Sequence, residues 1–107
     1  MKVLLINGSP HKKGCTYTAL HEVETTLQQN GIETEMLHLG KAPVSGCIAC
    51  MNCMTTGFCF QKDIVRDIQM RLDEFNGIVI GSPVYYSAPT GQLISFLNRL
   101  FFATEKR

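Results

Sequence analysis

Four of the five cysteines stand close together in one segment of the chain, with the spacing C-x2-C-x2-C-x5-C. They are Cys47, Cys50, Cys53 and Cys59. Thiolate sulfur binds iron, and four thiolates in one loop are the ligand set of a [4Fe–4S] cluster. Zinc fits less well, because structural zinc sites usually place a longer segment between two cysteine pairs. Without a metal, these cysteines would serve packing, a dithiol or contact with a substrate, since free cysteine is a small and often buried residue.

A second group of candidate residues forms a loop after an apolar strand, with the sequence Gly8-Ser9-Pro10-His11-Lys12-Lys13-Gly14-Cys15-Thr16. Its glycines permit a close backbone approach, and its serine and threonine offer hydroxyl groups. The helix expected next presents unpaired N–H groups and the positive end of its dipole, which suits a phosphate monoester. An ordinary strand-to-helix turn is the alternative. Neither the closing Gly-Lys-Ser/Thr of a nucleotide P-loop nor the Gly-x-Gly-x-x-Gly of dinucleotide folds is present, which favours a mononucleotide.

A third group follows another apolar strand, with the sequence Gly81-Ser82-Pro83-Val84-Tyr85-Tyr86-Ser87. Pro83 restricts the backbone, and the next three residues place a branched apolar group and two aromatic rings together. Such a surface can hold a flat heteroaromatic ring by stacking and by backbone hydrogen bonds. Alternatively, Tyr85 and Tyr86 only cover the end of the sheet.

The elements that must position these groups alternate between strand and helix. Apolar periodicity predicts strands over 3–6, 32–39 and 78–80, and helices over 16–29, 63–75 and 88–103. Right-handed crossovers place the first and third strands side by side, with the second strand outside the first. Both loops then flank the topological switch point, where open α/β sheets bind ligands. Residues 40–60 form a long irregular segment that holds the clustered cysteines, and a loop of this length is usually functional.

Composition narrows the class of protein. The 107 residues are 45% hydrophobic, which predicts one α/β domain over residues 1–107. A net charge of +1 gives no argument for nucleic acid or an anionic membrane as a partner. No apolar run approaches the length of a bilayer span, and the first residues do not read as a secretory signal. We therefore expect a cytoplasmic protein, in which the cysteines are kept reduced rather than paired in disulfides.

Three stretches together resemble the NAD(P)H-dependent FMN reductase and iron-sulfur flavoprotein branch of the flavodoxin-like fold. The stretches are Val3-Leu4-Leu5-Ile6-Asn7-Gly8-Ser9-Pro10 with Gly14-Cys15-Thr16, Gly81-Ser82-Pro83-Val84-Tyr85-Tyr86, and the last helix with Gly91-Gln92-Leu93 and Phe96-Leu97-Asn98-Arg99-Leu100. The match spans essentially the whole chain. It implies a doubly wound parallel sheet and an FMN cofactor. Cys15 stands where such sequences commonly have Asn or Ser, and His11 where Arg is common.

The resemblance also implies roles for individual residues. The FMN phosphate would be surrounded by Ser9, His11, Lys13, Gly14, Cys15 and Thr16. The isoalloxazine ring would lie along Pro83, Val84, Tyr85 and Tyr86. The four clustered cysteines also resemble the compact cysteine motif of iron-sulfur flavoproteins, which would make them ligands of a [4Fe–4S] cluster.

The expected activity is an oxidoreductase reaction in which the flavin carries the chemistry. NAD(P)H would deliver hydride to FMN, and the reduced flavin would pass electrons to a second acceptor, through the cluster where one is bound. That acceptor would be a small molecule or a redox protein. No side-chain acid or base is needed, so we expect no catalytic side chain. A flavodoxin-like electron carrier and a truncated module that acts only after assembly are the alternatives.

The length of the chain leaves the predicted sheet incomplete. Flavodoxin-like sheets normally have five strands, whereas the periodicity predicts only the first three strands and three helices here. The third strand would present an unpaired edge, and the last helix, with Leu97, Leu100 and Phe101, would lack part of its cover. We therefore expect a homo-oligomer.

Overall fold

Three parallel strands form the centre of the molecule, in the order β2-β1-β3. The computed structural model describes residues 1–104. Strand β1 (Lys2–Asn7) pairs with β2 (Glu33–His38) and with β3 (Gly77–Gly81), so that Val3 faces Thr34 on one side and Gly77 on the other. The predicted α/β class and strand order are confirmed, and they match part of a flavodoxin-like sheet.

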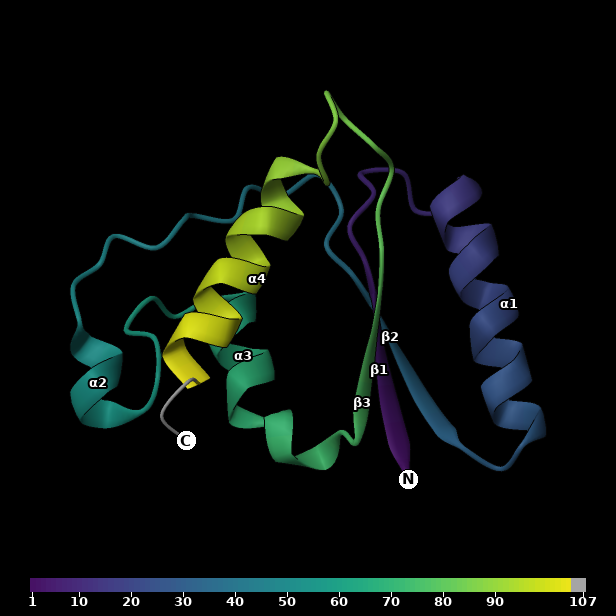
Figure 1. Ribbon diagram of the computed structural model, residues 1–107, viewed down its shortest axis with the longest axis horizontal. Helices are drawn as coiled ribbons and strands as arrows, with labels where there is room; N and C mark the ends of the chain where they lie inside the picture. The colour runs from purple at the N-terminus through teal and green to yellow at the C-terminus, as the bar shows by residue number, and fades with distance from the viewer. Residues whose placement is uncertain (105–107) are drawn as a thin grey trace.

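Helices cover both faces of this sheet (Figure 1). Helix α1 (Cys15–Gln29) lies on one face, while α3 (Ile64–Met70) and α4 (Gly91–Thr104) lie on the other. Successive residues of β1 point to opposite faces, so the strand contributes to two cores. Leu4 and Ile6 pack with residues of α3 and α4, whereas Val3 and Leu5 pack with Leu20 of α1. This two-sided burial explains the continuous apolar run of β1.

Several element ends differ from the sequence-based expectations. A short helix, α2 (Asn52–Thr56), lies inside the irregular segment 40–60 and was not predicted. Helix α3 ends at Met70 and is followed by a 3-10 turn, Leu72–Glu74. Helix α4 starts at Gly91 rather than at 88, because Tyr85 and Ala88 form a bridge that holds the preceding residues in a turn. Among the described residues, no helix has the length and apolar character needed to cross a membrane.

Candidate functional site

The loops after β1 and β3 are joined by hydrogen bonds at the carboxyl ends of the two strands. The Gly8 N–H donates to the carbonyl of Gly81 at 2.8 Å. The Thr90 hydroxyl donates to the carbonyl of Gly8 at 2.6 Å, and the Thr90 N–H donates to Ser82 Oγ at 3.1 Å. Thr90 is fully buried, so these bonds are shielded from water. The two loops are therefore held as one surface.

Glycine is required at both strand ends by close packing rather than by backbone angles. A Cβ atom added to Gly8 would lie 2.7 Å from Leu93 Cδ2, and one added to Gly81 would lie 2.9 Å from Leu20 Cδ1. Both distances are shorter than real Cβ contacts. The two glycines thus let α4 and α1 approach the sheet edge, which brings both loops close to the helices that follow them.

The loop after β1 is stabilised from beneath by polar groups. Buried Asn7 accepts the Ser9 N–H at 2.9 Å through Oδ1, and Ser9 Oγ accepts the His11 N–H at 3.1 Å. His38 of β2 is bonded through Nε2 to the Ser9 carbonyl at 3.0 Å. Asn7 Nδ2 is buried and has no hydrogen-bond partner among the described residues. The turn is therefore fixed by its own side chains, with one buried donor unpaired.

Helix α1 starts directly after this turn with an open N-terminus. Gly14 is its N-cap residue and supplies no side-chain hydrogen bond, so no cap side chain occupies the first-turn N–H groups. His11, Lys12, Lys13 and Cys15 are exposed around this end, and Gly14 and Thr16 are half-buried. A helix N-terminus with N–H groups and nearby cations attracts anions. This end can therefore accept a phosphate group.

The loop after β3 projects its side chains away from the body of the protein. Val84, Tyr85 and Tyr86 are exposed, whereas Pro83 is half-buried. Tyr86 and Ser87 have positive φ angles of 49° and 63°, and the Tyr85–Ala88 pair closes the turn by two backbone hydrogen bonds. The aromatic side chains predicted to contact a flat ring are thus exposed on the structure.

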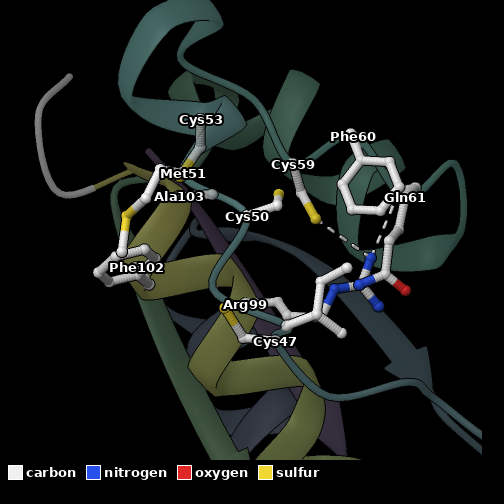
Figure 2. A pocket seen from close by; sticks show the side chains of 11 residues that line it. Cys47, Cys50, Met51, Cys53, Cys59, Phe60, Gln61, Arg99, Phe102 and Ala103 are labelled. Atoms are coloured by element: carbon white, nitrogen blue, oxygen red, sulfur yellow. Dashed lines mark hydrogen bonds between the residues drawn. The ribbon is translucent and has the colours of Figure 1, made fainter.

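All four clustered cysteines line one pocket beside α4 (Figure 2). Cys47 and Cys50 are exposed, and Cys53 and Cys59 are half-buried. The pocket is completed by Ile48, Met51, Phe60, Gln61, Arg99, Phe102 and Ala103. Cys15, the fifth cysteine, lies outside it. Within residues 1–104, no three side chains of the metal-ligating types are close enough together to hold a single metal ion. The four thiols that line this pocket are nevertheless the donor type that an iron–sulfur cluster uses.

Two residues of the cysteine segment have a left-handed backbone conformation. Ala49 and Met51, on either side of Cys50, have φ angles of 56° and 64°. Alternation of ordinary and left-handed residues turns successive N–H groups inward and creates a concavity for anions, including iron–sulfur groups. The Ala49 N–H already donates to Cys47 Sγ at 3.4 Å. The four thiols are thus the donor set of a [4Fe–4S] cluster, and the left-handed residues beside Cys50 are compatible with one.

Two buried polar residues hold Cys59, and neither was among the candidate residues derived from the sequence. Gln69 of α3 accepts the Cys59 N–H at 2.9 Å and donates to the Gly57 carbonyl at 3.1 Å. Arg99 of α4 donates from Nη2 to Cys59 Sγ at 3.5 Å. Each lies on the apolar stripe of its helix, Gln69 next to Ile68 and Arg99 next to Leu100. A polar residue next to apolar residues that keep helical spacing was the signal that could have found them.

Arg99 is fixed by an ion pair with Asp63, the N-cap residue of α3. Its Nη1 lies 2.6 Å from Asp63 Oδ2, and its Nη2 lies 2.8 Å from Oδ1. The Val65 N–H donates to Asp63 Oδ1 at 3.1 Å, so the same carboxylate caps α3. Burial alone would raise the pKa of Asp63, but the hydrogen bonds and charge of Arg99 hold that pKa below its ordinary value. Asp63 is therefore a carboxylate at neutral pH.

The sequence of this chain is similar to a known protein family and to several known proteins. The model of the family described as "NADPH-dependent FMN reductase" matches residues 1–107. An iron-sulfur flavoprotein from Methanocaldococcus jannaschii is 36% identical over 99 residues, which cover 92% of this chain and 51% of the relative. Two iron-sulfur flavoproteins from Archaeoglobus fulgidus are 31% and 34% identical, over 94% and 92% of this chain and 46% and 48% of their own lengths. The chain thus spans about half the length of these curated relatives.

Proposed function

The chain belongs to the NADPH-dependent FMN reductase family, and from this membership we propose that it binds FMN and transfers electrons from NAD(P)H to a second acceptor. We propose further that the four clustered cysteines bind a [4Fe–4S] cluster that serves as an electron carrier next to the flavin. The observation that carries the proposal is the joining of the β1 and β3 loops at one sheet edge by the Gly8–Gly81 and Thr90–Gly8 hydrogen bonds.

The residues at this edge supply both halves of an FMN site. The phosphate would lie against the open N-terminus of α1, near Ser9, His11, Lys13, Gly14, Cys15 and Thr16. The isoalloxazine ring would lie along Pro83, Val84, Tyr85 and Tyr86. Ser9 is held by Asn7 and His38, so its backbone is fixed before any ligand arrives. The exposed aromatic side chains would lose accessible surface on contact with the ring, which favours binding.

Helix α4 connects the two proposed cofactor sites. Its first residue, Gly91, follows Thr90, which joins the two loops, whereas Arg99 lines the cysteine pocket. At a rise of 1.5 Å per residue, Thr90 and Arg99 are about 14 Å apart along the helix axis. Gln92 donates to the Gly40 carbonyl at 3.0 Å, which anchors the start of the cysteine-rich loop to the same helix.

When bound, FMN supplies two-electron and one-electron redox chemistry, and an iron–sulfur cluster supplies one-electron chemistry. The protein's part is to place the two groups near each other and to leave a face open for NAD(P)H. The second acceptor would be a small molecule or a redox protein.

The visible absorption spectrum of the anaerobically purified protein, before and after addition of FMN and desalting, tests this proposal. We expect retained flavin bands together with a broad iron–sulfur shoulder, and oxidation of NADPH or NADH by the loaded protein. Flavin bands without turnover would indicate an electron carrier. A protein that retains no flavin would overturn the proposed FMN site.

The cysteine assignment is tested separately by a matched pair of variants. We expect Cys50→Ser to lower the iron content and the shoulder while flavin binding persists. Cys15→Ser, at the cysteine outside the pocket, should keep the wild-type iron content. Equal iron content in both variants and in the wild type would show that Cys50 is no ligand.

A further inference from the structure

Arg99 is a buried cation in the wall of the cysteine pocket. Its side chain is 1% exposed. Besides its bonds to Asp63 and Cys59, Nη1 donates to the Ser45 carbonyl at 3.0 Å and Nη2 to the Gln61 carbonyl at 3.3 Å. Ser45 precedes the cysteine segment and Gln61 follows it. One guanidinium therefore fastens both ends of this segment to α4, as the bonds to Cys59 and Gln61 in Figure 2 show in part.

The ion pair with Asp63 leaves the positive charge facing the cysteines. Arg99 is among the residues that line the pocket, whereas Asp63 is not. Asp63 compensates much of the cost of burying a charge, yet it does so from outside the pocket. A group seated among the cysteines would thus be nearer to the cation than to the carboxylate.

One donor of Arg99 remains unpaired. Its Nε is buried and has no hydrogen-bond partner among the described residues. A buried, unsatisfied donor costs roughly 1–3 kcal/mol, more when it belongs to a charged group. Leucine or methionine at this position would bury apolar surface without that cost. An arginine here is better explained by what it does for a neighbouring anion than by stability alone.

We propose that Arg99 is a positioning residue for the iron–sulfur cluster, which fixes Cys59 through its hydrogen bond to Sγ and raises the cluster's reduction potential through its buried charge. The proposal rests on the proposed function. Thiolate-ligated clusters are anionic, and one-electron reduction adds a negative charge while no bond is made or broken. Hydrogen bonds to ligand sulfur and nearby positive charge favour the more negative state.

The test is a potentiometric titration of the reconstituted protein with dithionite as the reductant, monitored by the cluster's electron paramagnetic resonance signal. The variant combines Arg99→Gln with Asp63→Asn, which removes both charges and keeps a good N-cap residue for α3. We expect its midpoint potential to fall by about 59 mV, equivalent to a tenfold change in the one-electron equilibrium constant.

The matched control combines Arg71→Gln with Glu35→Gln. Arg71 also forms a two-pronged pair with a carboxylate, at 2.6 Å and 2.9 Å, but neither residue lines the cysteine pocket. The midpoint potential of the cluster in this control variant should equal that of the wild type. A second variant, Arg99→Lys, keeps the charge but cannot reproduce the forked contacts, so we expect a smaller fall in potential. This variant also provides the test if the double variant does not fold.

The outcomes separate this inference from the proposed function. A wild-type protein that takes up no cluster overturns this inference and the proposed cluster, whereas the proposed FMN site is decided by retention of flavin. A wild-type cluster whose potential is unchanged in the folded Arg99 variants overturns only the role of Arg99. An equal fall in the Arg71 control would also overturn it, because the effect would then not depend on the guanidinium beside Cys59.

Discussion

The turn after β3 is built from residues that fit its backbone poorly. Both central residues of the turn between Tyr85 and Ala88 have positive φ angles, which Asn-Gly adopts far more readily than Tyr86-Ser87. Tyr86 is also fully exposed, so no burial of its ring offsets this strain. Residues held in such conformations are concentrated at functional sites. Presentation of an aromatic ring to a ligand is a physical reason to keep Tyr86 there.

Residues that favour this turn should therefore raise the stability of the protein when they replace Tyr86-Ser87, and should weaken the binding of the ligand. We expect Tyr86→Asn with Ser87→Gly to raise the free energy of unfolding by about 1–2 kcal/mol, measured by urea denaturation, because both strained positions are relieved. The lost aromatic contact should weaken FMN binding about fivefold to tenfold. Ser87→Gly alone is the control: it should raise stability with unchanged FMN affinity. Unchanged affinity in the double variant would remove Tyr86 from the binding surface.

Gly8 offers a second test at the level of single atoms. We expect Gly8→Ala to lower the free energy of unfolding by about 1–3 kcal/mol, since the new methyl group would overlap the Leu93 side chain. Because Gly8 also joins the two loops, FMN binding should weaken in the same variant. Gly91→Ala is the matched control, because a Cβ there meets nothing within 4 Å and alanine favours a helix. Equal destabilisation by both substitutions would refute the packing argument.

At the scale of elements, α3 and α4 are coupled through one carboxylate. Asp63 caps the first turn of α3 and pairs with Arg99 of α4. The two helices also share an apolar contact, because Val65 and Ile68 pack in one core with Phe96 and Leu100. The cysteine-rich segment is attached at this junction through Arg99 and Gln69. Protonation of Asp63 should therefore weaken the start of α3, the contact between α3 and α4, and the attachment of the cysteine-rich segment.

This coupling predicts how stability depends on pH. The pKa of Asp63 in the folded protein lies below its ordinary value of 3.8, so between the two values the unfolded chain binds more protons. The stabilisation is fully present above pH 3.8 and is lost as the pH falls through the lowered pKa. We expect the urea midpoint of Asp63→Asn to fall less steeply with acid than that of the wild type. Arg71 likewise lowers the pKa of Glu35, so the urea midpoint of the variant should still fall to some extent with acid. An equally steep fall of the urea midpoint in the wild type and in Asp63→Asn would contradict the role of Asp63.

The strongly periodic elements could be predicted from the sequence, whereas the contacts between them could not. The apolar run of β1 and the stripe of α1 indicated their structures because each pattern is local. Helix α2 is too short to show periodicity, and its start depends on the left-handed Met51. The cysteine spacing suggested a shared site, but the contact of Arg99 with Cys59 joins residues 40 positions apart. Such a contact is set by the packing of α4 against α3.

At the scale of the whole molecule, the sheet has an edge that the described residues leave open. Strand β3 pairs only with β1 within residues 1–104, and Ile80 is 42% exposed on it. The expectation for the last helix is confirmed in part. Leu100 is fully buried, whereas Phe101 and Ile94, seven positions apart on one helix face, are exposed. An exposed apolar edge strand favours pairing with another chain.

We propose that this protein self-associates through β3, and sedimentation velocity over a range of concentrations measures it. The wild type should show a concentration-dependent shift towards larger species. Ile80→Lys places a charge on the edge, which opposes strand pairing, and should weaken association at least tenfold. The control is Glu33→Lys, an exposed position on β2, the opposite edge of the sheet, where we expect no weakening. A wild type that stays monomeric at all concentrations would refute self-association. Equal weakening by both lysines would instead show that association does not depend specifically on the β3 edge.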